Sequence, residues 1–108
     1  MTIDGRFEIT RNILWNLTNE FTLKQDIISW AENTYTNFLN FDRHEIVPVV
    51  AALVLVINHR CWYWEKESNE ELMEVYADLY YKYNNLAWDW LEANGTDEEK
   101  HWYFETLD

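Results

Sequence analysis

The stretch from Ile46 to Ile57, IVPVVAALVLVI, is the longest uncharged apolar run in this chain of 108 residues. It is too short to span a bilayer, because a transmembrane helix needs about 20 apolar residues. The run therefore predicts the buried centre of a globular protein. Its Val and Ile content leaves a buried strand as an alternative. We favour a helix, because the chain has no second comparable apolar segment with which such a strand could pair.

The composition around this run also favours helices. Gly and Pro together make up three residues, whereas average usage would give about a dozen in this length. Folds with many tight turns consume both residue types. Apolar residues reach 48% and charged residues 26%, an ordinary globular mix that excludes intrinsic disorder. We expect one all-α domain over residues 1–108, with about five helices bundled around a buried central helix.

Signals for helix starts recur along the chain. Asp4 is a candidate N-cap for a first helix, whose expected buried face is Phe7, Thr10, Leu14, Leu17 and Phe21. Four capping boxes of the type S/T/D-x-x-E/Q then predict four further starts: Thr22 with Gln25, Asp42 with Glu45, Ser68 with Glu71, and Thr96 with Glu99. The recurrence of one start signal supports the all-α prediction.

Two residues set the expected limits of the central and fourth helices. Pro48 would disturb a helix that begins at Arg43, so we expect the regular part of the central helix to begin nearer Val47. Gly95 is expected to end the fourth helix at its C-terminal position. The fifth helix is expected to run to about Glu105.

Charge is distributed unevenly along the chain. Twenty acidic and eight basic residues give a net charge of −12, of which residues 1–64 carry −2 and residues 65–108 carry −10. Nucleic acids and anionic membranes repel such a chain, because both bind Lys/Arg patches. We therefore expect no direct nucleic-acid binding and no membrane binding. Charge asymmetry between two halves suggests an interaction surface for a protein partner.

The fourth helix concentrates this acidic charge on one side. At ~100° per residue, its apolar arc would be Leu72, Val75, Tyr76, Leu79, Tyr83, Leu86, Trp90 and Ala93. Carboxylates fill the opposite arc, with two large aromatic residues on its flank. Only Lys82 and Asn85 interrupt this arc. Solvated faces normally mix charge signs, whereas the carboxylates Glu67, Glu70, Glu71, Glu74 and Asp78 repel one another. The predicted partner-binding set is Glu67, Glu70, Glu71, Glu74, Asp78, Tyr81, Trp88, Asp89 and Glu92.

The acidic arc and its two flanking aromatic residues also have explanations that involve no binding partner. The acidic arc can be an ordinary solvated helix face, and the two flanking aromatics can be covered by another segment. The fifth helix, with Trp102, Tyr103 and Phe104, is the candidate cover. Aromatic residues make up 18% of the chain, so a homodimer that buries some of them is a further alternative.

The search for catalytic or metal chemistry finds no complete motif. The chain has no nucleophile elbow, P-loop, dinucleotide fingerprint or H-E-x-x-H. Glu98-x-x-His101 matches one half of a di-iron carboxylate site, but the second half is missing. His59 and Cys61 lie two residues apart, so on one helix they point in different directions. We expect no enzyme activity, no catalytic or metal site and no cofactor.

The cysteine content and the N-terminus point to one compartment. A single cysteine, Cys61, excludes a disulfide framework and fits a reducing cytosol. The N-terminal residues MTIDGRFEIT have no apolar core of a signal peptide. The expected location is the cytoplasm, or the host cytoplasm if a phage encodes the chain.

In composition, the chain resembles the small acidic inhibitors encoded by phages and mobile elements. That resemblance implies a non-enzymatic protein that blocks a basic, nucleic-acid-binding protein, by mimicking DNA or by plugging a basic groove. Its target would be a defence enzyme such as a CRISPR effector or a restriction enzyme. The first alternative is an immunity protein or antitoxin that caps a basic toxin. Another is a homo-oligomeric structural component whose acidic face keeps it soluble.

Overall fold

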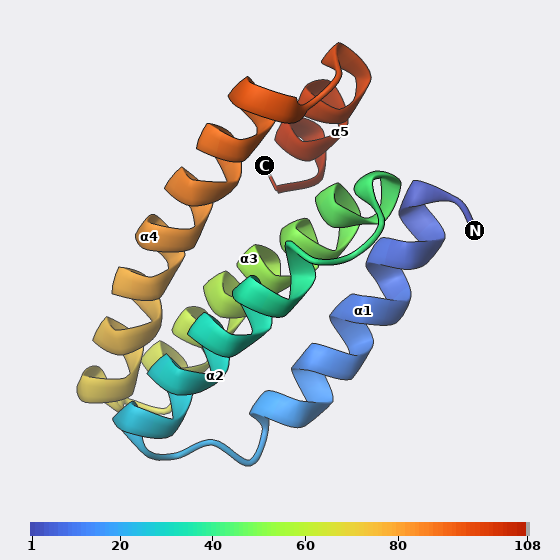
Figure 1. Ribbon diagram of the computed structural model, residues 1–108. Coiled ribbons are helices and arrows are strands. Elements are labelled where there is room, and N and C mark those ends of the chain that lie inside the picture. The colour runs from blue at the N-terminus through green and yellow to red at the C-terminus, as the bar shows by residue number, and fades with distance from the viewer. Residues whose placement is uncertain (108) are drawn as a thin grey trace.

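Helix α3 (Arg43–Lys66) contains the apolar run and lies at the centre of the structure, packed against all four other helices (Figure 1). The computed structural model describes residues 1–107, and in this range the chain forms five α-helices and no strand. Every residue from Ile46 to Ile57 except Leu55 is buried. The predictions of an all-α bundle and of a buried central helix are thus confirmed.

The other helices surround α3. They are α1 (Ile3–Thr18), α2 (Lys24–Phe38), α4 (Glu70–Asn94) and α5 (Asp97–Leu107). Figure 1 shows α1 and α4 on either side of α3, with α2 in front of it. α5 folds back against α3. The most acidic helix, α4, is therefore separated from α1 by the core.

Helix α3 begins earlier than its sequence predicts. It starts at Arg43 and continues through Pro48 without interruption, so the expected start nearer Val47 is wrong. Proline removes one backbone donor, which would otherwise bond the carbonyl four residues before it, at His44. His44 is exposed, so water can bind this carbonyl, and the helix tolerates the proline near its start.

Only one of the four expected capping boxes forms. The Thr96 N–H donates to Glu99 Oε1 at 2.9 Å, and the Glu99 N–H donates to Thr96 Oγ1 at 3.1 Å. The residues that precede α2 and α3 are Leu23 and Asp42, and neither accepts a capping bond through its side chain. At the start of α4, Asn69 Oδ1 accepts from the Leu72 N–H at 3.1 Å.

Ser68 is not the cap of α4 because it forms the turn before that helix. Its φ of 60° places it in the left-handed region, which is rare for residues other than Gly, Asn and Asp. At the other end of α4, Gly95 stops the helix as expected. A Cβ atom at Gly95 would lie 2.8 Å from the Leu91 carbonyl oxygen, so this close approach requires glycine.

The start of α1 is held by α5. Asp4 is not the cap: its Oδ1 accepts a hydrogen bond from Trp102 Nε1 at 2.8 Å. Thr2 takes the capping role, with its Oγ1 accepting from the Gly5 N–H at 3.0 Å. The Trp102 ring also contacts Phe7 edge-on, at 5.5 Å between centroids. Helices at the two ends of the chain thus meet over α3.

The end of α1 is fixed by a buried arginine of α3. Leu17 is 48% exposed, whereas Thr18 is buried, so the expected inward position of Leu17 is wrong. Arg60 Nε donates to Thr18 Oγ1 at 2.9 Å, and Arg60 Nη2 donates to the Trp15 carbonyl at 2.6 Å. The guanidinium lies 3.6 Å from the Trp15 ring centroid. Burial lowers the pKa of Arg60, whose charge is met by a carbonyl and a ring.

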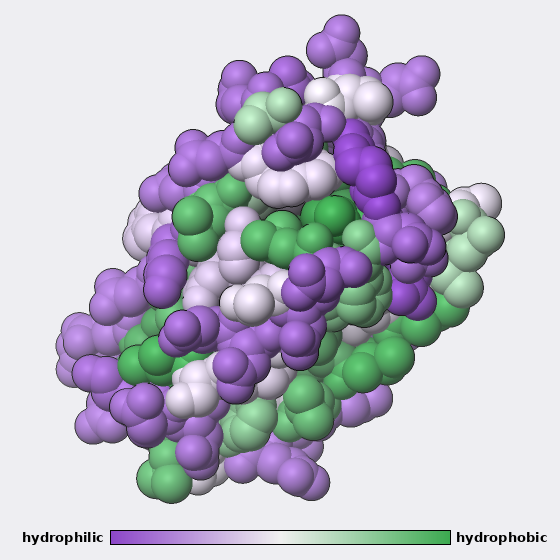
Figure 2. Space-filling view, in the orientation of Figure 1, coloured by the Kyte–Doolittle hydropathy of each residue, from purple (hydrophilic) through white to green (hydrophobic). Residues whose placement is uncertain are grey.

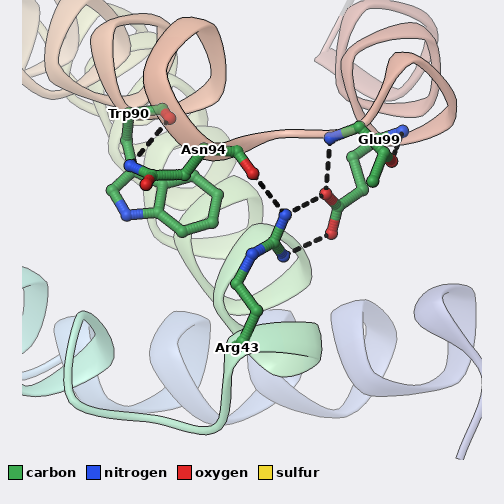
Figure 3. A network of polar contacts seen from close by, with 5 residues as sticks. Arg43, Trp90, Asn94 and Glu99 are labelled. Carbon is green, nitrogen blue, oxygen red and sulfur yellow. Dashed lines mark hydrogen bonds and ion pairs between the residues drawn. The ribbon is translucent and has the colours of Figure 1, made fainter.

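A second arginine joins the start of α3 to the end of α4 and the start of α5 (Figure 3). Arg43 forms a two-bond pair with Glu99, at 2.7 and 2.9 Å, and donates to the Asn94 carbonyl at 2.6 Å. Its guanidinium also lies 4.8 Å from the Trp90 ring centroid. The bond from Arg43 lowers the pKa of Glu99. This network fixes the turn between α4 and α5.

By length and composition α3 could also cross a membrane, with a mean hydropathy of 1.6 over its most apolar 18 residues. In the fold, 67% of that window is buried inside the protein. Burial of this kind is typical of a core helix. One such helix is weak evidence for a membrane span.

Candidate partner-binding face on α4

The acidic residues of the predicted set are exposed and unpaired. All seven carboxylates lie at the surface: Glu67, Glu70, Glu71, Glu74, Asp78, Asp89 and Glu92. None of them forms an ion pair with any residue between 1 and 107. Six of the seven lie on α4, whereas Glu67 is the residue that caps the end of α3, so its expected place on the fourth helix is wrong. We call these seven residues the acidic face.

Three of these carboxylates share one hollow. Glu71, Glu74 and Asp78 line a depression of about 160 Å³ at the junction of α4 with the start of α2. Val75 and Leu79 of α4 also line it, and both are buried. The hollow thus combines an apolar wall with three carboxylates along one side. We call it the α2–α4 hollow.

The α2 side of this hollow was not expected from the sequence. Lys24 and Ile28 complete its lining, although neither belongs to the predicted set. No local signal marks them, because they lie more than 40 residues before α4 and only tertiary packing brings them there. Lys24 is exposed and forms no ion pair among residues 1–107. It supplies a positive charge at the rim without neutralising a particular carboxylate.

The carboxylates of the acidic face differ in how much their negative charge destabilises α4. Glu70 and Glu71 lie in the first turn of α4, where the helix dipole stabilises negative charge. Glu74 and Asp78 lie beyond that turn and face each other at i, i+4, a spacing that destabilises a helix by roughly 0.2–0.5 kcal/mol per like-charged pair. Asp89 and Glu92, at i, i+3 in the second half of α4, likewise lie outside the turn in which the helix dipole stabilises negative charge.

The two aromatic residues of the predicted set are in different environments. Tyr81 is 67% exposed and contacts only the neighbouring ring of Tyr80 among the aromatic pairs of residues 1–107. Trp88 is half-buried and packs edge-on against Tyr103 of α5, at 5.3 Å between centroids. The Tyr103 hydroxyl donates to Asn84 Oδ1 at 2.8 Å. Tyr81 is thus free to contact a partner, whereas Trp88 also serves the packing of α5.

The apolar arc of α4 rotates toward its C-terminal end. Ala93 is exposed, whereas Ala87 and Leu91 are buried, so the expected arc is wrong in its last turns. From Tyr83 onward the buried positions advance in steps of four, which rotates the buried face by about 40° per step. Ala87 and Leu91 line a small apolar cavity together with Tyr103 of α5. The last turns of α4 therefore bury these positions against α3 residues as well as against Tyr103 of α5.

The half di-iron motif and the His59–Cys61 pair can both be placed in the structure. Among residues 1–107, no cluster of three or more His, Cys, Asp or Glu side chains could hold a metal ion. His101 Nε2 lies 3.2 Å from Glu105, not from Glu98. Burial raises the pKa of Cys61 and lowers that of His59. A thiol with a raised pKa is a poor nucleophile at neutral pH.

Comparison with known proteins gives no assignment. No family model, no curated protein and no solved structure matches this chain. A function can therefore be argued only from the chain's own residues.

Proposed function

We propose that this protein is a non-enzymatic inhibitor that binds the Lys/Arg-rich surface of a nucleic-acid-binding protein and blocks it. The observation that carries this proposal is the α2–α4 hollow, where Glu71, Glu74 and Asp78 lie beside an apolar wall and have no ion-pair partner among residues 1–107. A Lys or Arg side chain suits such a site, because its aliphatic stem packs on apolar atoms while its charged head meets carboxylates.

The rest of the acidic face supports the same partner class. Its carboxylates extend along α4, so a basic groove could be contacted at several points at once. A field of one sign also steers an oppositely charged partner and speeds its association. The expected location for such an inhibitor is the cytoplasm, where nucleic-acid-binding enzymes work.

The experiment that tests this function compares two triple variants as baits in a lysate of the native host. The first variant carries Glu71→Gln, Glu74→Gln and Asp78→Asn, which removes the charge of the hollow and keeps its shape. The matched control carries Glu20→Gln, Asp26→Asn and Glu98→Gln, three exposed residues without an ion pair among residues 1–107. Both variants lose the same charge by the same chemistry.

We expect the wild type and the control to retain the same basic protein, identified by mass spectrometry, and the hollow variant to lose it. The purified target should then release labelled DNA or RNA when the wild type is added. Binding should weaken as salt rises, because salt screens surface charges over a Debye length of about 8 Å at physiological ionic strength. Equal retention by both variants would overturn the assignment to the hollow.

The same experiment separates the alternative function. A retained partner that is a toxin encoded beside this gene would identify an immunity protein or antitoxin instead. If no variant differs and no basic protein is retained, the acidic face is a solvated surface.

A further inference from the structure

One flank of α1 carries exposed apolar residues, whereas the positions that face directly away from α3 include the polar residues Glu8, Asn12 and Asn16. Ile9, Ile13 and Leu17 are 45%, 60% and 48% exposed, and they follow one another at intervals of four residues. Figure 2 shows apolar surface over α1 on the side that faces the viewer. Single exposed apolar residues are common, but a row of three on one helix forms a continuous patch. We call these three residues the α1 stripe.

A groove runs beside the α1 stripe. It has a volume of about 290 Å³, with Ile13 and Leu14 on one wall and Phe38 and Phe41 on the other. The groove exists because α1 and α2 pack on α3 rather than on each other. An apolar side chain from a second molecule could enter it beside Ile13.

The charges of α1 are balanced, unlike those of residues 65–108. Asp4, Arg6, Glu8 and Arg11 give this helix a net charge of zero. Arg11 pairs with Glu8 at 2.7 Å. Residues 65–108, in contrast, carry −10. Along α1, therefore, a second copy of this chain meets little repulsion.

The position of the acidic face also favours contact between α1 and a second copy of this chain. Because α1 and α4 lie on opposite sides of α3 (Figure 1), two copies that meet through α1 would turn both acidic faces outward. The molecule is 22 Å across its short axes, so the two faces would lie much further apart than the Debye length of about 8 Å. A contact through α4 would bring like charges together instead.

We propose that the α1 stripe is the contact surface of a homodimer. The stripe is symmetric about Ile13: in an antiparallel pair with a two-fold axis at that residue, Ile9 of one copy lies opposite Leu17 of the other. Such an interface uses the same patch on both copies. Rows of residues at i±4 pack at a crossing angle of about −50°. A single helix of ~24 Å offers a small interface, so the expected association is weak, with a Kd of about the micromolar range.

The test measures the mass of the full-length protein in solution by sedimentation equilibrium, at concentrations up to about 0.5 mM. Ile13→Asp places two carboxylates at the two-fold axis and should weaken dimerisation by more than about 100-fold. Tyr81→Asp is the matched control, because Tyr81 is also more than half exposed but lies on α4. It should leave the dimer unchanged. Circular dichroism checks that both variants remain helical.

A cross-link gives a second readout that does not depend on a destabilising charge. In a Cys61→Ser background, Ile13→Cys should form an intermolecular disulfide under mild oxidation, whereas Tyr81→Cys should not. The dimer should persist or strengthen at high salt, while a complex of the acidic face with a basic target should weaken. The two proposals can therefore fail separately. A wild type that is monomeric at every concentration and salt level, or a dimer that survives Ile13→Asp, would overturn the proposal.

Discussion

Helices α1 and α4 lie on opposite sides of α3 and present opposite kinds of surface. The acidic face of α4 is charged with one sign, and its carboxylates have no ion-pair partners between residues 1 and 107. Helix α1 has balanced charges and an exposed apolar stripe along one flank. The first surface suits a basic partner at long range, and the second suits an uncharged, self-complementary contact at short range.

This difference shows how one small chain can place a charged binding surface and an apolar binding surface on two different helices. The core helix α3 lies between α1 and α4 and contacts both. A substitution in the α1 stripe therefore touches no residue of the acidic face, and the reverse also holds. A −12 chain can associate with itself only where its charge is low. The α1 stripe is such a place, and the following predictions test whether the two sides are indeed independent.

The largest expected effect comes from Arg60, which attaches the end of α1 to α3. Arg60→Ala removes the donor to the Trp15 carbonyl and leaves a cavity under that ring. We expect a loss of roughly 3 kcal/mol or more of unfolding free energy, measured by denaturant titration. Arg60→Met should lose less, because its side chain still packs where the arginine stem lies.

Hydrogen exchange then tests the independence of the two sides. In Arg60→Met, amides in the last turn of α1 should exchange faster, whereas amides in the second half of α4 should keep their protection. Equal acceleration in both helices would mean that they open as one cooperative unit. In that case the surfaces of α1 and α4 would still differ in charge and polarity, but the two helices would not unfold independently.

An intermediate effect separates the two aromatic residues of the acidic face. Trp88→Ala should lower the unfolding free energy by roughly 1–2 kcal/mol, because a half-buried ring that supports Tyr103 is lost. Tyr81→Ala should change stability by less than about 0.5 kcal/mol but raise the dissociation rate of a target complex. If Trp88→Ala is as stable as the wild type, its contact with α5 contributes little and Trp88 is available as an anchor.

The sequence was sufficient for the helices but not for their connections. The run from Ile46 to Ile57 has too many apolar residues to lie anywhere but in the core, so the position of α3 followed from it. Capping was less predictable, because several polar residues compete for one helix start. Asn69, not Ser68, caps α4, since Ser68 is used for the turn.

Contacts between distant segments could not be predicted. The bond from Arg60 to Thr18 joins residues 42 positions apart, and no local pattern distinguishes a buried arginine from a surface one. The same holds for Lys24 in the α2–α4 hollow. In contrast, the exposed carboxylates of α4 were predictable, because their spacing alone places them on one side of a helix.

A paired carboxylate and an unpaired one should respond to neutralisation in opposite directions. Glu99 accepts two bonds from Arg43 and one from the Thr96 N–H, so Glu99→Gln should lower the unfolding free energy by about 1–3 kcal/mol at neutral pH. Arg43 lowers the pKa of Glu99 below its ordinary value of 4.5. Its contribution is therefore fully present above pH 4.5 and is lost as pH falls through the lower, folded-state pKa. Wild type and variant should converge in acid.

Glu74→Gln should act in the opposite direction at neutral pH. Glu74 has no ion-pair partner among residues 1–107 and lies four residues before Asp78 on the same helix. Removing its charge relieves its like-charge contacts with Glu70, Glu71 and Asp78, which should raise the unfolding free energy by roughly 0.2–0.5 kcal/mol per pair. Denaturant titrations of the two variants in parallel resolve the opposite signs. A loss of stability in Glu74→Gln would mean that this carboxylate already has a favourable partner in the fold, and the acidic face would then be part of the structure rather than a surface kept free for binding.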